Sequence, residues 1–232
     1  MGALLTAVHV GLICVVFRAM LGFVSLPLSE SLGFYGAYHQ DPVNQAIHFL
    51  FVPTLLFSFL VYFAHHPLPV VPQLGSLSTL LSCAYGLFYV VLDPKGGVLY
   101  CLLQLIPIHA AAMYLVGQDR SGDLDSEKKK KKKSDDAAVS KSEGTKRSLR
   151  IAGFLQVLGW YMQIHPGHAV YEGAKPALLD SLGQSLSVAP LFAFYEGLWA
   201  AGLFQELHAE TKSAVVRKRA ELCRAGGSFR FC

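Results

Sequence analysis

Long apolar stretches separated by short polar breaks run through most of the chain. A helix that spans a membrane needs about 20 mostly apolar residues. The stretches that approach this length are residues 3–24, 45–63, 76–92, 98–116, 149–164 and 184–205. This pattern predicts an all-α protein, and more specifically a multi-pass membrane helical bundle.

The polar breaks divide the chain. Residues 1–30 lack a basic start and a small-residue cleavage site, so we interpret them as an N-terminal anchor or interfacial helix. Asp93 to Gly97 is a favourable turn sequence, and it predicts a hairpin of two spans. The remaining predicted parts are residues 31–116 as the first half of a helical membrane domain, 117–148 as a linker, 149–208 as the second half of the same domain and 209–232 as a basic tail.

The linker is rich in Ser, Asp, Lys and Gly and has almost no large apolar residue. Such a segment cannot bury enough surface to offset the entropy lost on ordering, so we expect it to be disordered. Its lysine run, residues 128–133, contains no aromatic residue, and therefore does not indicate a nucleic-acid partner.

Composition agrees with a membrane protein. Hydrophobic residues make up 53% of the chain and charged residues 16%, well below the quarter typical of soluble domains. The net charge of +4 comes from the linker and the tail, and the positive-inside rule places both in the cytosol. Tracing the spans from there gathers a few polar residues near the opposite membrane face: His39, His48, Asp93, His168 and Glu172. The five scattered cysteines, without a CxxC pair, argue against a disulfide framework and a cysteine-based zinc site.

The first cluster of candidate residues precedes and enters the span at 45–63. Asn44 and His48 are four residues apart and share a helical face. A helix broken at Asp41-Pro42 would let His39 fold back toward His48. A histidine in an apolar segment is often only a packed core residue, but polar groups at membrane depth are costly and usually functional.

The second cluster follows residues 149–164. His168 and Glu172 are also four residues apart. The carboxylate can bind the same metal as the imidazole, or it can orient the histidine. Two histidines and a carboxylate with open positions form the ligand set of non-haem Fe(II) oxygenases. The chain has no P-loop, GxSxG or HExxH motif that would indicate another chemistry.

Other polar residues leave alternatives open. His165 is adjacent to the second cluster and could replace one ligand, whereas His109 lies deep in its helix and favours a core role. Asp93 can cap the hairpin turn. Glu196 lies in an apolar helix, where a lone carboxylate is costly, and we expect it to pair with a site histidine, a tyrosine or Lys175.

These clusters resemble the Mpo-like family of Fe(II)-dependent 2-hydroxy fatty acid dioxygenases. The resemblance covers roughly residues 31–205 without the linker. Its motifs are Phe34-Tyr35 through Tyr38-His39, Asn44, His48 and Pro53; Tyr89 through Asp93; Gln163 through Gly167-His168, Glu172-Gly173 and Pro176-Ala177-Leu178; and Ala189-Pro190-Leu191-Phe192 with Glu196.

The resemblance implies a function and roles for the residues. Long-chain 2-hydroxy fatty acids, formed in phytosphingosine breakdown, would undergo Fe(II)- and O₂-dependent α-oxidation to fatty acids one carbon shorter. The fungal members are multi-pass proteins of the endoplasmic-reticulum membrane. His39, His48 and His168 would hold Fe(II). Glu172 would be a further ligand or an orienting group, and Asn44 would support a ligand or contact the substrate.

The chain departs from the family pattern at residues 1–30, in the lysine linker, and in residues 164–166, where one additional residue leaves the role of His165 open. Two other readings compete with the dioxygenase. One is a membrane zinc hydrolase that acts on ceramide-like lipids, in which zinc activates a water. The other is a non-catalytic membrane protein whose histidines are only packed.

Overall fold

The computed structural model describes residues 26–68, 75–131, 143–177 and 182–225, together with Gly11, Arg18 and Cys232. Within these ranges the regular elements are helices, apart from an isolated antiparallel bridge between Pro67 and Ser76, which confirms the all-α class. The helices are α2 (Leu28–Gly36), α3 (Pro42–Ala64), α4 (Leu77–Leu92), α5 (Pro94–Tyr100), the π-helix η2 (Cys101–Leu105), α6 (Ile106–Lys131), α7 (Glu143–Met162), the π-helix η3 (Gln163–Glu172), α8 (Leu182–Ala200) and α9 (Gln205–Arg224).

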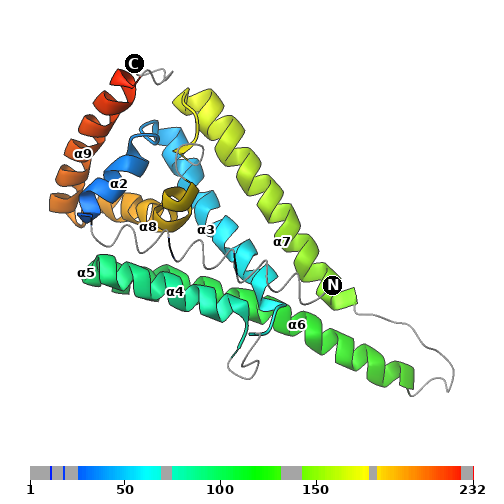
Figure 1. Ribbon diagram of the computed structural model, residues 1–232. Helices are drawn as coiled ribbons and strands as arrows, with labels where there is room; N and C mark the ends of the chain where they lie inside the picture. The colour runs from blue at the N-terminus through cyan, green and yellow to red at the C-terminus, as the bar shows by residue number, and fades with distance from the viewer. Residues whose placement is uncertain are drawn as a thin grey trace.

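Helix α3 is the central element. It contacts α4, α6, α7, η3 and α8. Figure 1 shows α7 running antiparallel to α3 on one side and the layer of α4, α5 and α6 on the other. The elements α2, α8 and α9 gather around the end where α3 begins. The two halves predicted on either side of the linker therefore pack against each other around α3.

The start of α3 is determined locally. Asp41 caps the helix: its Oδ1 accepts hydrogen bonds from the backbone N–H groups of Val43 (2.8 Å) and Asn44 (3.1 Å). Pro42 occupies the first helical position, where its missing N–H costs nothing. The helix break expected at Asp41-Pro42 is thus observed.

The predicted hairpin is also present, and Asp93 has the capping role. Its carboxylate accepts hydrogen bonds from the backbone N–H groups of Lys95 and Gly96, at 3.1 Å each. The Tyr195 hydroxyl of α8 donates a further hydrogen bond to it. Asp93 therefore joins the hairpin to α8, and within the described residues it does not lie in the histidine cluster.

Tyrosines on α4 hold α8 at a point where a proline interrupts that helix. Pro190 has no N–H, so the Leu186 carbonyl four residues earlier lacks its usual donor. The Tyr85 hydroxyl donates to this carbonyl (2.8 Å), and the Tyr89 hydroxyl donates to the Ser187 carbonyl (2.7 Å). Buried tyrosines usually bond their hydroxyls in this way.

The linker prediction needs a correction at both ends. Helix α6 continues to Lys131 and α7 begins at Glu143, so residues 117–131 and 143–148 are helical rather than irregular. Lys, Glu and Arg are good helix formers, and a helix already nucleated in an apolar segment extends through them at low cost. Residues 132–142 lie outside the described part, and disorder there stays a prediction.

The structure describes only part of the two terminal segments. The predicted anchor at residues 1–30 lies largely outside the described residues. The predicted boundary at 208/209 falls inside α9, which packs on α2 so closely that a Cβ on Gly33 would lie 2.4 Å from Ala214 Cβ. A disulfide joins Cys223 to Cys232, a pairing that the scattered cysteine spacing did not indicate because it depends on where Cys232 lies beside α9.

Among the described residues, two helices are long and apolar enough to cross a membrane: Pro42–Ala64, and Pro94–Gly122 within the continuous α5–η2–α6 rod. Helix α4 is apolar but shorter. The core helix of a soluble protein can pass the same test, so the multi-pass architecture stays a prediction.

Candidate metal site

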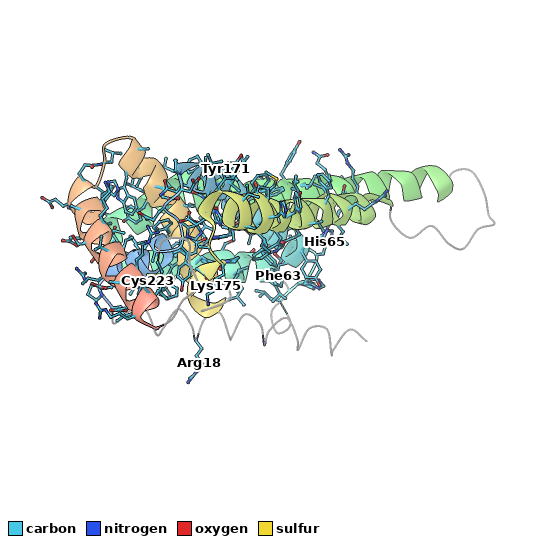
Figure 2. The ribbon with its side chains drawn as sticks, turned by 90° about the horizontal axis from the view of Figure 1, so that it is seen from above. Arg18, Phe63, His65, Tyr171, Lys175 and Cys223 are labelled. Atoms are coloured by element: carbon cyan, nitrogen blue, oxygen red, sulfur yellow. A yellow bond between two sulfur atoms is a disulfide. The ribbon has the colours of Figure 1, made fainter. Side chains whose placement is uncertain are left out.

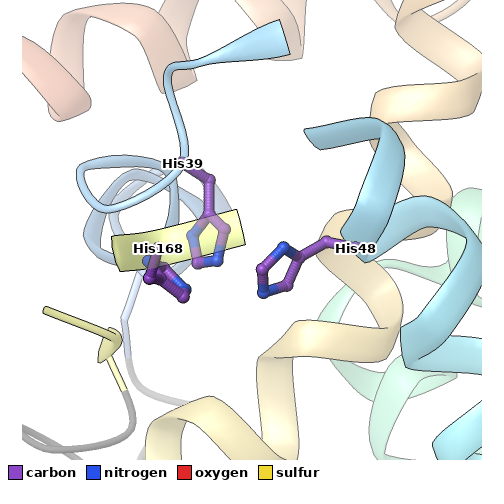
Figure 3. A group of neighbouring side chains, drawn as sticks. All are labelled: His39, His48 and His168. Carbon is purple, nitrogen blue, oxygen red and sulfur yellow. The ribbon is translucent and has the colours of Figure 1, made fainter. Parts of the chain in front are cut away.

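Three histidines from separate elements converge in the interior. His39 lies in the connection between α2 and α3, His48 in the second turn of α3, and His168 in η3 (Figure 3). All three are buried, and their candidate ligand nitrogens lie within 4.8 Å of one another. The ring centroids are 4.3 Å apart for His39–His48, 4.8 Å for His39–His168 and 5.0 Å for His48–His168.

Backbone carbonyls orient two of the rings. His39 Nδ1 donates to the Tyr35 carbonyl (2.8 Å), and His48 Nδ1 donates to the Asn44 carbonyl (3.0 Å). Each imidazole therefore carries its proton on Nδ1 and keeps the Nε2 lone pair for another partner. The Tyr35 ring also stacks on His39 at a centroid distance of 4.1 Å.

The inward nitrogens fit a metal ion. His39 Nε2 and His168 Nδ1 are buried and make no hydrogen bond within the described structure. A buried polar atom without a partner is costly, and it calls for an explanation such as an ion. Three converging imidazole nitrogens are a suitable donor set for zinc, iron or copper.

The protonation state agrees with metal binding. Burial, followed by the nearby His48 and His168, lowers the pKa of His39 well below its ordinary value. Burial, followed by His48, lowers the pKa of His168 to about 3. Both rings are therefore neutral near pH 7, which is the form of imidazole that binds a metal.

Glu172 faces the loop that carries His39. Its carboxylate accepts hydrogen bonds from the backbone N–H groups of Gln40 (3.0 Å) and Asp41 (2.9 Å) and from Asn44 Nδ2 (3.1 Å). Of the two roles considered for Glu172, this geometry favours the orienting one. The carboxylate joins η3 to the start of α3 and thereby keeps His39 and His48 close to His168.

The π-helical geometry of η3 positions His168. A π-helix bonds each residue to the one five positions away and accommodates one additional residue in a turn. The departure from the family pattern lies in the same segment, at residues 164–166. Gly167 allows η3 to approach Asn44, because a Cβ at this position would lie 2.5 Å from Asn44 Oδ1.

Other candidates lie outside the cluster. His165 is exposed and stacks on Tyr161 at 5.5 Å. His109 Nδ1 lies within hydrogen-bond distance of two serine hydroxyls on α4, at 3.1 and 3.3 Å, which agrees with its core role. The pairing expected for Glu196 is not observed, because both of its carboxylate oxygens are buried without a hydrogen bond among the described residues.

An apolar cavity adjoins the histidines, and the sequence pattern did not predict it. On α3 its wall consists of side chains three or four residues apart that continue the His48 face. This periodic stripe was the available signal, but it does not distinguish a cavity wall from a packed core. The lining residues are Tyr35, His39, His48, Val52, Leu55, Leu56, Phe59, Phe63, Leu81, Tyr85, Trp160, Gln163, Ile164, His168, Pro176, Ala177, Ser185, Leu186, Ala189 and Pro190.

Comparisons with known proteins show the family of the chain. A family model described as 2-hydroxy-palmitic acid dioxygenase Mpo1-like matches residues 25–199, which include all three histidines. The 2-hydroxy-palmitic acid dioxygenase MPO1 of Saccharomyces cerevisiae is 34% identical over 188 residues, which are 79% of this chain and 87% of the yeast protein. No solved structure matches the chain. The chain therefore belongs to the Mpo1-like family of 2-hydroxy-palmitic acid dioxygenases.

Proposed function

We propose that this protein is a non-haem iron dioxygenase of the endoplasmic-reticulum membrane. In this proposal it shortens long-chain 2-hydroxy fatty acids by one carbon through Fe(II)- and O₂-dependent α-oxidation, as a step in sphingolipid breakdown. The observation that carries the proposal is a cluster of three buried imidazoles at an apolar cavity, in a chain of this dioxygenase family.

In this proposal the site residues and the cavity have different roles. His39, His48 and His168 would hold Fe(II), which, when bound, supplies the activation of O₂ toward the α-hydroxycarboxylate. Glu172 keeps the His39 loop and the start of α3 in place, because its carboxylate accepts hydrogen bonds from the N–H groups of Gln40 and Asp41 and from the Asn44 amide. The apolar cavity excludes water from the reacting carbons and binds the acyl chain, because burial of apolar surface is favourable.

The membrane location has its own support. Large apolar side chains are exposed along the outer side of the α5–η2–α6 rod and on α7. Many exposed large apolar side chains on two long helices support an interaction with a membrane. These side chains include Val98, Leu102, Leu103, Ile106, Tyr114, Phe154, Val157 and Tyr161.

One observation favours a second candidate. Within the described residues the cluster consists of three histidines and no carboxylate, which is also a ligand set of catalytic zinc, a metal that activates a water without O₂. A zinc hydrolase that acts on ceramide-like lipids would therefore use the same cluster.

Metal analysis and a turnover assay distinguish the candidates. The protein is purified without oxygen, its bound metals are quantified, and the O₂-dependent shortening of 2-hydroxypalmitate is followed by mass spectrometry. We expect iron in stoichiometric amount, O₂ uptake that matches product, and loss of both iron and turnover in His39→Ala and His168→Ala. Stoichiometric zinc without O₂ uptake would contradict the proposal, and absence of any metal with unchanged stability of both variants would favour packed histidines.

A further inference from the structure

We propose that the cavity selects the length of the acyl chain, with the histidines at its polar end and Phe59 and Phe63 at its far end. This inference rests on the proposed function, because it takes the occupant of the cavity to be the chain of a fatty acid. In this proposal the apolar face of α3 also determines which acyl-chain lengths the cavity accepts.

The lining residues of α3 form one straight stripe. They follow His48 at positions 52, 55, 56, 59 and 63, which is the spacing of one helical face. From His48 to Phe63 the helix rises over 15 residues, or about 22 Å at 1.5 Å per residue. The cavity wall therefore extends well beyond the space needed for a small polar substrate.

This length suits a long acyl chain. A carbon–carbon bond of about 1.5 Å advances an extended chain by roughly 1.25 Å per carbon. The stripe thus corresponds to roughly sixteen to eighteen carbons, with the carboxylate and the 2-hydroxyl group at the histidines. The yeast relative is named for a 2-hydroxy acid of this length class, 2-hydroxy-palmitic acid.

The polarity of the wall gives the chain its direction. The imidazoles are at the start of the stripe, and beyond His48 the α3 wall is entirely apolar. On the facing helices, the hydroxyl of Tyr85 is already bonded to the Leu186 carbonyl, and the Gln163 amide donates to the Gly159 carbonyl (3.2 Å). Ser185 of α8 also lines the cavity, and its hydroxyl is buried without a hydrogen bond among the described residues. A carboxylate therefore finds several converging nitrogens at the histidine end and a single hydroxyl on α8, while the rest of the wall is hydrocarbon.

The middle of the cavity cannot widen easily. Helix α7 approaches α3 at Gly159, where an added Cβ would lie 2.7 Å from Leu55 Cδ2. The Gln156 amide also donates to the Leu55 carbonyl (3.3 Å) and ties the two helices together. A rigid wall at this level allows the cavity to discriminate by length.

Aromatic rings form the far end. Phe63 is buried, and its ring lies 6.5 Å from Phe59 and 5.5 Å from Tyr62. Figure 2 shows Phe63 displaced along the long axis of the molecule from Tyr171 and Lys175, which flank the end of η3 and thus the histidine end. Replacing this ring with a smaller side chain would add space where the terminal methyl group lies.

Three substitutions on α3 test the assignment. Phe63→Ala removes the end wall, and Phe63→Leu removes less of it. Leu56→Phe places a ring eight residues beyond His48, about 12 Å along the helix. An extended acyl chain of roughly ten carbons would reach this point. Phe57→Ala is the matched control, because Phe57 is a half-buried phenylalanine of the same helix that does not line the cavity.

Two readouts separate this inference from the proposed reaction. The first is the affinity of unsubstituted saturated fatty acids, measured by displacement of a fluorescent fatty acid from the purified protein, and it requires no turnover. The second is the distribution of products from an equimolar mixture of 2-hydroxy acids of different lengths.

We expect Phe63→Ala to shift the preferred length upward by a few carbons and Phe63→Leu by less. Leu56→Phe should lower the affinity for sixteen-carbon chains at least about tenfold relative to ten-carbon chains, the scale of discrimination by hydrophobic pockets. Phe57→Ala should keep the preference of the original protein. An unchanged length preference in both Phe63 variants, or no binding of any chain by the original protein, would overturn the inference. Selective binding without turnover of any 2-hydroxy acid would instead leave the length selection standing and reject the reaction.

Discussion

At the scale of single residues, Glu172 connects the parts of the site. Its side chain is buried, and its carboxylate accepts hydrogen bonds from two backbone N–H groups of the His39 loop and from the Asn44 amide. Charged acceptors form stronger hydrogen bonds than neutral ones. The loop is therefore held by a side chain more than one hundred positions away in the sequence.

Glu172→Gln should weaken metal binding without emptying the site. The glutamine keeps the size of the side chain, but it has one acceptor oxygen and an NH₂ group that cannot accept from Gln40 or Asp41. We expect the affinity for iron to fall about 10–100-fold, as is typical when a group that orients a ligand is lost. Competition with a chelator measures this affinity. The exposed Glu210→Gln is the control, and equal affinities in the two variants would refute the role of Glu172.

Gly167→Ala should disturb the contact between η3 and α3. The new Cβ would lie 2.5 Å from Asn44 Oδ1, so the buried Asn44 amide, which donates to Glu172, would have to shift. We expect destabilisation of about 1–3 kcal/mol, the usual cost of overpacking. Thermal unfolding in detergent measures it. Gly153→Ala in α7, where the added Cβ meets no atom within 4 Å, should be neutral or slightly stabilising.

The lowered pKa values predict acid sensitivity of the metal-free protein. His39 and His168 stay neutral when folded, but they take up protons near their ordinary pKa of about 6.5 when unfolded. The unfolded state therefore binds more protons below this pH. The free energy of unfolding should fall by up to about 1.4 kcal/mol per pH unit for each histidine as the pH decreases toward the pKa of about 3 of His168.

Unfolding of the chelator-treated protein across this pH range tests the sign. His168→Gln should reduce the slope, whereas Gly153→Ala, which changes no titratable group, should leave it unchanged. A stability that is constant or rises on acidification would contradict the burial of neutral imidazoles.

At the scale of elements, interruptions of regular helices create the site. Pro42 separates α3 from the loop of His39, η3 departs from α-helical geometry, and Pro190 frees a carbonyl in α8. Partners on other elements compensate two of them. Glu172 of η3 accepts hydrogen bonds from the N–H groups of Gln40 and Asp41 before Pro42, and the Tyr85 hydroxyl of α4 donates to the Leu186 carbonyl. The elements that carry the site thus depend on one another for their hydrogen bonds.

Tyr85→Phe should weaken the attachment of α8 to α4, in which the Tyr89 hydrogen bond to the Ser187 carbonyl remains. It removes only the hydroxyl and leaves the Leu186 carbonyl without a donor. A carbonyl left unpaired in the interior costs about 1–3 kcal/mol. We expect a lower melting temperature in detergent, with the metal content retained. Tyr114→Phe removes a hydroxyl from an exposed ring of α6 and should have no effect, so an equal change in both variants would contradict the coupling.

At the scale of the whole molecule, the exposed apolar surface predicts an integral membrane protein. Leu103 and Ile106 are 63% and 57% exposed, on a rod that is long enough to cross a membrane. We expect the protein to stay in the membrane pellet after an alkaline carbonate wash and to enter solution only with detergent. Release by the wash would contradict the membrane assignment.

Arginine substitutions refine this test. An arginine at the centre of a spanning helix costs about 2.5–3.5 kcal/mol of insertion free energy. Leu103→Arg together with Ile106→Arg should therefore lower the amount of inserted protein. Val216→Arg changes an equally exposed residue of α9, outside the candidate spans, and should not.

The sequence by itself determined the helical class, most helix positions, the break at Asp41-Pro42 and the three histidines worth considering. These features depend on local rules, because periodicity, prolines and caps act within a few residues. It did not determine where α6 ends, since charged helix formers are compatible with both a helix and a disordered linker.

Only the tertiary structure decided what the polar residues face. A spacing of four residues places His168 and Glu172 on the same side of a helix. The packing of η3 against the start of α3 then directs His168 toward His39 and His48, and Glu172 toward the loop that carries His39. Packing likewise turned His165 outward and left a cavity beside the α3 stripe. These outcomes depend on contacts between segments far apart in the chain, and a periodic pattern within one segment contains no information about its partner.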